Sequence, residues 1–123
     1  MPSILAVDDS AAMRQMLAYT LRSAGHQVTE AVDGVDALEK LQGRNYDVVL
    51  TDQNMPRMDG FEFTKTIKAD DRQSHIPIIM ITSRTAEKHR NHAMELGVNE
   101  YLGKPYQDDQ LLALVARYVG RPV

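Results

Sequence analysis

The sequence predicts one α/β domain, with a five-stranded parallel sheet wound on both faces by helices. Two observations lead to this fold class. Short apolar runs alternate with segments of helical spacing five times along the 123 residues. Buried parallel strands have this continuous apolar composition, and a helix between two strands implies a right-handed crossover. The length suits one domain, which we predict over residues 1–123 without a second domain.

The first strand is predicted at Ile4–Val7, a short apolar run. Ser10 suits the N-cap of the following helix, and Gly25 suits the position just past its end. The apolar residues of this helix recur at helical spacing. They are Met13, Met16, Leu17, Leu21 and Ala24.

The middle of the chain repeats the pattern. Val28–Ala31 predicts a second strand, and Asp33-Gly34 leads into a helix that ends near Gly43. Val48–Thr51 predicts the third strand, and residues 53–60 form a loop because they contain proline and glycine.

The last part supplies two more strands and three helices. The helices are expected at Phe61–Lys68, Ala86–Leu96 and Gln107–Val119. The strands are expected at Ile78–Thr82, which is strongly apolar, and at the shorter Glu100–Gly103.

Composition limits the class of protein. There are no cysteines, which excludes disulfides and thiolate metal sites and favours a reducing compartment. We see neither a signal-peptide pattern nor an apolar run near the roughly 20 residues that span a bilayer. The formal net charge of −3 argues against nucleic acid as a partner. We therefore expect a cytoplasmic protein with neither a membrane nor a nucleic acid as its partner.

Acidic residues follow two of the predicted strands. Asp8 and Asp9 come directly after the first strand, and Asp52 follows the third. The carboxyl ends of parallel strands meet at one edge of the sheet, so these carboxylates should converge there. They would repel one another unless a cation joined them. Oxygen ligands of this kind suit Mg²⁺.

A hydroxyl and an ammonium group are predicted at the same edge. Thr82 ends the fourth strand, and Lys104 follows the fifth. Transfer of a phosphoryl group needs alignment and charge stabilisation above all. An acidic nucleophile, metal-binding carboxylates, a hydroxyl and an ammonium group together predict a phosphoryl-transfer site.

The motifs at these strand ends resemble those of response-regulator receiver domains, and the resemblance covers essentially the whole chain. They are Val7-Asp8-Asp9-Ser10, Thr51-Asp52-Gln53-Asn54-Met55-Pro56-Arg57-Met58-Asp59-Gly60, Ile81-Thr82-Ser83 and Tyr101-Leu102-Gly103-Lys104-Pro105. Single-domain, CheY-like chemotaxis regulators are the most similar members. The resemblance implies a flavodoxin-like fold with strand order 2-1-3-4-5 and no output domain.

The resemblance also implies roles at the acidic edge. Asp52 matches the phosphoacceptor, which attacks a phosphohistidine. Asp9, Asp52 and the backbone carbonyl of Asn54 match the direct Mg²⁺ ligands, and Asp8 matches an acid that acts through metal-bound water. Asn54 also occupies a position that tunes dephosphorylation in this family.

Further roles are implied on the last two strands. Thr82 and Lys104 match the groups that hold the phosphoryl oxygens. Tyr101 matches an aromatic switch that turns inward when Thr82 moves toward the phosphate. Arg84 occupies a second position that tunes dephosphorylation, where it could shield the phosphoryl group or pair with Glu87. The Lys104–Pro105 peptide matches a bond that is usually cis.

The expected function is a Mg²⁺-dependent receiver that takes its phosphoryl group from a CheA-like histidine kinase. It would not be an enzyme acting on a separate substrate. It would signal in chemotaxis or motility to a downstream target that binds the face of helix four, strand five and helix five. The alternative is the receiver module of a hybrid kinase, which would relay phosphate to a histidine phosphotransfer protein.

Two unrelated functions fit less well. An FMN-binding flavodoxin needs a phosphate loop after the first strand, where Asp8 and Asp9 would repel phosphate. A haloacid-dehalogenase-like phosphatase needs a second aspartate where Asn54 stands.

Other residues are interpreted as structural. His89 and His92, three apart on a helix, are expected on a solvated face and not at a metal. Met13, Met16 and Met94 are expected to fill the core.

Overall fold

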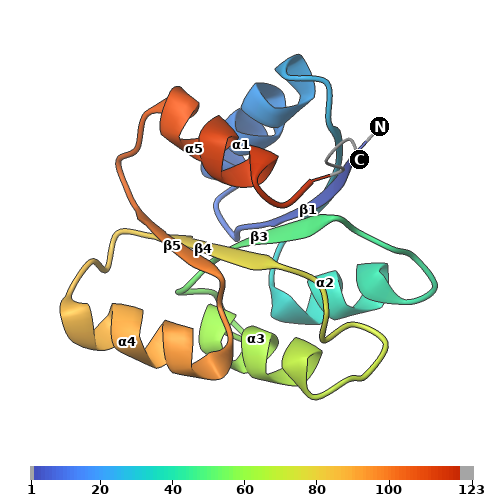
Figure 1. The fold of residues 1–123 in the computed structure, drawn as a ribbon, viewed down its shortest axis with the longest axis vertical. Coiled ribbons are helices and arrows are strands. Elements are labelled where there is room, and N and C mark those ends of the chain that lie inside the picture. The colour runs from blue at the N-terminus through green and yellow to red at the C-terminus, as the bar shows by residue number, and fades with distance from the viewer. Residues whose placement is uncertain (1, 120–123) are drawn as a thin grey trace.

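The computed structural model describes residues 2–119, which form a five-stranded parallel sheet covered by five helices (Figure 1). The strands are β1 (Ser3–Val7), β2 (Gln27–Ala31), β3 (Val48–Asp52), β4 (Ile78–Thr82) and β5 (Glu100–Gly103). The helices are α1 (Ala11–Ser23), α2 (Gly34–Leu41), α3 (Gly60–Lys68), α4 (Glu87–Leu96) and α5 (Asp108–Ala116). The hydrogen-bonded order is β2-β1-β3-β4-β5, which confirms the predicted fold class and strand order.

The helices divide between the two faces of the sheet. Figure 1 shows α1 and α5 together on one face, and α2, α3 and α4 on the other. Leu21 and Leu111 pack in the cluster beneath the first pair of helices. Ala37, Phe63 and Ala93 pack in the cluster beneath the other three. The sheet is thus covered by an apolar layer on each side.

Strand β1 shows why the strands read as continuous apolar runs. Successive side chains of a strand point to opposite faces. Leu5 and Val7 accordingly pack in the α2–α3–α4 cluster, while Ile4 and Ala6 pack in the α1–α5 cluster. Both faces of the strand are buried, so no polar position interrupts it.

Helix ends follow local chemistry. The side chain of Ser10 accepts the backbone N–H of Met13 at the start of α1, which confirms the predicted cap. Gly25 follows this helix with φ of 94°, and Gly97 ends α4 with φ of 105°. These left-handed conformations favour glycine.

Two sequence predictions about packing are wrong. Met16 and Met94 are 65% and 41% exposed, so they do not fill the core. On α1 the buried face consists of Leu17, Ala18 and Leu21, and it is narrower than the apolar stripe of the sequence.

Helix α5 is also shorter than predicted, since it ends at Ala116 with Arg117 as its C-cap residue. Among the described residues, no helix has the length and apolar character needed to cross a bilayer.

Candidate functional site

Four strand ends bring the predicted site residues to one edge of the sheet. In the parallel register, Val7 pairs with Thr51, and Thr82 pairs with Gly103. The residues just beyond these pairs are therefore neighbours. Side chains that are far apart in the sequence meet here because the strand ends are aligned.

Three carboxylates converge at this edge. Oxygen atoms of Asp8, Asp9 and Asp52 all lie within 4.8 Å of one another. Asp8 is buried, Asp52 is partly buried and Asp9 is exposed. Hard oxygen ligands with an open, solvent-facing side are the donor set that Mg²⁺ prefers, because this ion keeps several of its waters. The residues present thus fit a magnesium ion.

Lys104 places a positive charge against this cluster. Its Nζ lies 3.3 Å from Oδ2 of Asp8 and 3.7 Å from Oδ1 of Asp52. The Lys104–Pro105 peptide is cis, as predicted. One ammonium group cannot neutralise three carboxylates, so the cluster remains electronegative and attracts a cation.

The charge balance shows most clearly at Asp52. Burial raises the pKa of its carboxyl above the usual value, and Asp8 and Asp9 raise it further. Lys104 opposes this rise, as does the backbone N–H of Gln53, which donates to Oδ1 of Asp52 at 2.9 Å. The ionised form of Asp52 is therefore costly until more positive charge arrives.

Two hollows lie at the acidic cluster. Asp8, Asp52 and Lys104 line one of them, together with apolar residues of β1, β4 and α1. Asp9 and Asn54 line the other, which opens toward solvent. Asn54 thus lies beside the acidic cluster, on the side of Asp9.

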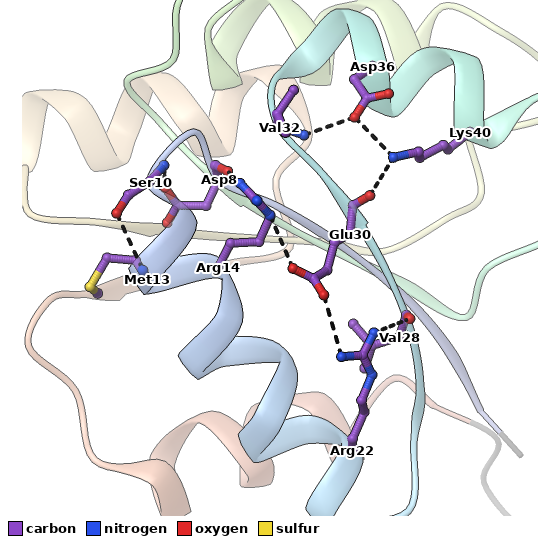
Figure 2. Close-up of polar contacts among 10 residues, drawn as sticks. All are labelled: Asp8, Ser10, Met13, Arg14, Arg22, Val28, Glu30, Val32, Asp36 and Lys40. Carbon is purple, nitrogen blue, oxygen red and sulfur yellow. Dashed lines mark hydrogen bonds and ion pairs between the residues drawn. The ribbon is translucent and has the colours of Figure 1, made fainter.

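The loop after β1 is held by α1 and β2. Oδ1 of Asp8 accepts the N–H of Ser10 at 2.9 Å, and its carbonyl accepts Nη1 of Arg14 at 2.9 Å. Arg14 also pairs with Glu30 on β2 at 3.1 Å, and Glu30 reaches Arg22 at 3.4 Å. Figure 2 shows Glu30 between the two arginines of α1. Helix α1 is therefore fastened to the edge strand.

Helix α2 is tied to the same strand. Nζ of Lys40 donates to the carbonyl of Glu30 at 2.6 Å and to Asp36 at 3.0 Å (Figure 2). Asp36 in turn accepts the N–H of Val32 at 3.0 Å. These contacts hold β2, and through it the loop that carries Asp8, from both faces of the sheet.

Gly60 brings the loop after β3 back against Asp52. Its N–H donates to the carbonyl of Gln53 at 2.8 Å. A Cβ atom at Gly60 would lie 2.4 Å from the carbonyl oxygen of Asp52, closer than any side chain can approach. A residue without a side chain is therefore required here.

Thr82 and Tyr101 lie at the β4–α4 side of the site. Oγ1 of Thr82 accepts the N–H of Arg84 at 3.1 Å, which leaves the hydroxyl proton free to donate. The Tyr101 ring is partly buried against the α2–α3–α4 cluster. Its hydroxyl lies 2.7 Å from Oε1 of Gln53 and also contacts the carbonyl of Arg84. The Arg84 residue is exposed.

Sequence reasoning missed four residues near the site. Gln53 was interpreted only as the start of a loop, yet it is 3% exposed and contacts Tyr101. His89 was expected on a solvated face, but its Nδ1 lies 3.4 Å from Nε2 of Gln53. Arg57 and Asp33 join the loop after β3 to α2 through an ion pair. In the sequence, only the position of Gln53 directly after the acidic strand end is a possible signal, and the other three residues have none.

Comparison with known proteins agrees with this geometry. The family model of the response regulator receiver domain matches residues 4–116. Chemotaxis protein CheY1 of Helicobacter pylori is 43% identical over 105 residues, which cover 84% of this chain and 85% of that protein.

Solved structures are similar over nearly the whole chain. Chemotaxis protein CheY4 of Vibrio cholerae aligns with a TM-score of 0.91 and 39% identity, covering 96% of this chain and 98% of that one. The receiver domain of a sensor histidine kinase from Pseudomonas aeruginosa aligns with a TM-score of 0.88 and 31% identity, covering 95% and 96% of the two chains. That second structure has a magnesium ion coordinated in its active-site cleft.

Proposed function

Because this chain belongs to the response-regulator receiver family, we propose that it is a Mg²⁺-dependent receiver in which Asp52 accepts a phosphoryl group from a histidine kinase. The observation that supports this most is the meeting of three carboxylates with the ammonium group of Lys104. Such a cluster is costly to build for stability alone, since it leaves like charges close together.

The transfer uses Asp52 as the nucleophile. A carboxylate oxygen of Asp52 forms a bond to phosphorus while the bond between phosphorus and the histidine nitrogen breaks. The nitrogen keeps the electron pair, and Asp52 becomes an acyl phosphate. The protein thus promotes its own phosphorylation and later dephosphorylation, without turning over a separate substrate.

The metal would be held by the carboxylates of Asp9 and Asp52 and the backbone carbonyl of Asn54, with Asp8 acting through water. When bound, Mg²⁺ supplies positive charge that neutralises the incoming phosphoryl oxygens. A magnesium ion in the cleft of the Pseudomonas aeruginosa receiver supports this assignment by similarity.

Lys104 and Thr82 then hold the phosphoryl oxygens. Lys104 already lies within 3.7 Å of Asp52, and Thr82 has a hydroxyl proton to donate. The contacts of Lys104 and Thr82 with the phosphoryl oxygens exist only in the phosphorylated protein. Phosphorylation therefore favours the conformation in which these contacts are better made. Movement of Thr82 would be coupled to Tyr101 and change the face formed by α4, β5 and α5, which a downstream target reads.

The signalling pathway is proposed from the relatives. Those with the names of chemotaxis proteins are about 40% identical, which supports a cytoplasmic regulator of chemotaxis or motility served by a CheA-like kinase. The solved receiver of a sensor histidine kinase favours a second candidate, a hybrid-kinase receiver that relays phosphate. Rapid return of phosphate from Asp52 to a histidine phosphotransfer domain would support the second candidate.

The test is phosphorylation by acetyl phosphate, with and without Mg²⁺, read by intact mass. We expect a phosphoryl adduct on the wild type only when Mg²⁺ is present, and none on Asp52→Asn. Asp71→Asn is the matched control, because Asp71 is an exposed aspartate away from the site, and it should be labelled normally. Normal labelling of Asp52→Asn would overturn the assignment.

A further inference from the structure

Gln53 is a buried amide between the site and the tyrosine of β5. It is 3% exposed and follows Asp52 directly. Its backbone N–H donates to the Asp52 carboxylate, while its side chain reaches Tyr101 on β5 and His89 on α4. One residue therefore contacts the acceptor carboxylate and two other elements at once.

If the side-chain oxygen of Gln53 faces Tyr101, the Tyr101 hydroxyl has more acceptors than it has protons to donate. In that orientation the Tyr101 hydroxyl meets two acceptors, Oε1 of Gln53 at 2.7 Å and the carbonyl of Arg84. A phenol has one proton, so it cannot donate a full hydrogen bond to both. The oxygen that receives no proton then faces a lone pair of the phenol oxygen at hydrogen-bond distance, and the two oxygens repel each other.

A half-turn of the Gln53 amide removes the conflict, because its oxygen and NH₂ ends have nearly the same shape. Nε2 then donates to the Tyr101 oxygen, and the Tyr101 proton is free for the carbonyl of Arg84. Oε1 turns toward Nδ1 of His89 and accepts a hydrogen bond from it when Nδ1 carries the ring proton. Every group in this network then has a partner.

We propose that Gln53 is a positioning residue for Tyr101, donating its amide proton to the tyrosine oxygen in an orientation selected by an Nδ1–H of His89. The network ties β3, β5 and α4 together beside Asp52. It rests on the proposed function only for its meaning as a switch, since the hydrogen bonds belong to the protein before phosphorylation.

The first test labels the tyrosines with 3-fluorotyrosine and follows Tyr101 by ¹⁹F NMR, with Tyr101→Phe to assign its resonance. Gln53→Met keeps an unbranched side chain of similar length but removes the amide. We expect the Tyr101 resonance to move or split. The ratio of populations between the ring orientation seen here and any other orientation should change about two- to tenfold, which is the effect of one lost hydrogen bond. An unchanged Tyr101 resonance in Gln53→Met would overturn the positioning role.

The chain offers a matched control. Gln73 is another buried glutamine, 8% exposed, and its amide donates to the carbonyl of Leu41. Gln73→Met should leave the Tyr101 resonance in place. A shift of the same size in Gln73→Met would show that any buried amide has this effect, and the proposal would fail.

The second test examines His89 directly by long-range ¹H–¹⁵N NMR of the histidine rings, with His89→Gln for assignment. We expect Nδ1 of His89 to carry a proton in the neutral ring. A bare Nδ1 would place the Gln53 oxygen at Tyr101 after all and overturn the donor assignment.

A third arm separates this inference from the proposed function. Beryllium fluoride with Mg²⁺, a stable mimic of a phosphoryl group, is added to the fluorotyrosine-labelled wild type. No binding at Asp52 would count against the receiver function, while the Gln53 variants would still report on the network. Binding at Asp52 with no dependence of Tyr101 on Gln53 would count against the inference alone.

Discussion

Arg57 and Asp33 form a bidentate ion pair that joins the loop after β3 to the start of α2. Nε of Arg57 lies 2.7 Å from Oδ2 of Asp33, and Nη2 lies 3.1 Å from Oδ1. Asp33 also caps α2 by accepting the N–H of Asp36. Arg57 has φ of 66°, which is uncommon for a residue with a side chain, so the ion pair holds a backbone shape that the chain does not favour. The same loop carries Asn54.

This pair predicts an acid-dependent contribution to stability. The hydrogen bond from Arg57 lowers the pKa of Asp33 below its ordinary value of 3.8. A lowered pKa means that the contribution is complete above 3.8 and is lost as the pH falls below it. Arg57→Gln should therefore unfold at lower urea than the wild type at pH 7, and this difference should shrink in acid below 3.8. Urea unfolding across this pH range is the measurement.

Arg72→Gln is the control for that series. Arg72 pairs with Asp70 at 3.6 Å, but its side chain is 82% exposed, and exposed pairs add little. An equal loss in Arg72→Gln would contradict a special role for the loop. Arg57→Gln should also bind Mg²⁺ more weakly, since the loop of Asn54 is loosened.

Asp52→Asn should stabilise the metal-free protein at neutral pH. The pKa of Asp52 is raised in the folded state, so the carboxyl of the unfolded chain loses its proton at a lower pH. Stability therefore falls as the pH rises from the pKa of the unfolded chain to that of the folded protein. Asparagine removes that charge while keeping the shape. Thermal unfolding without Mg²⁺ should show a higher Tm for Asp52→Asn at pH 7 and a smaller gain near the ordinary pKa of 3.8. A lower Tm at pH 7 would mean that the carboxylate is structural.

Gly60→Ala should be more harmful than Gly34→Ala. An added Cβ would meet the carbonyl oxygen of Asp52 at 2.4 Å in the first variant, and the flexible side chain of Met58 at 2.7 Å in the second. Rotation of the Met58 side chain relieves the contacts with its Cγ and Sδ, although its Cβ also lies at 2.9 Å, whereas the backbone carbonyl of Asp52 on β3 has no such freedom. We expect Gly60→Ala to lose about 1–3 kcal/mol of unfolding free energy, in the range of overpacked cores, and Gly34→Ala to lose less. Denaturant unfolding compares the two, and the reverse order would contradict the reasoning.

Lys104→Ala should accept phosphate but fail to transmit it. The proposed acceptor Asp52 and the proposed metal ligands remain, so a Mg²⁺-dependent adduct should still form with acetyl phosphate. The contact that distinguishes the phosphorylated state is lost, and phosphate shifts a conformational equilibrium only through such differences. The measurement is amide hydrogen exchange of α4, β5 and α5 before and after addition of beryllium fluoride. The exchange rates should change in the wild type but not in Lys104→Ala. Lys65→Ala, at an exposed lysine, is the control and should behave as the wild type does.

The sequence predicted the parts of the site that depend on strand ends. Asp8 and Asp52 follow apolar runs and Lys104 follows the predicted fifth strand, and alignment of parallel strands is enough to bring them together. The expectation for Tyr101 came from the motif and not from packing.

Other contacts could not be read from spacing. Gln53 and His89 are 36 residues apart, and Arg57 and Asp33 are 24 apart. Their contacts depend on how α4 and the loop after β3 lie against neighbouring elements. The exposure of Met16 and Met94 likewise depends on how wide a face each helix buries, which an apolar stripe does not determine.

The contact between Lys104 and Asp8 spans 96 residues of chain, which affects how the protein is made. A ribosome releases Asp8, Asp9 and Asp52 well before Lys104 emerges. During that interval the nascent chain carries its acids without the ammonium group that partly offsets them. Closing so long a loop is entropically costly and occurs only when β5 joins the sheet. The site is thus assembled only after β5 has been synthesised and has joined the sheet.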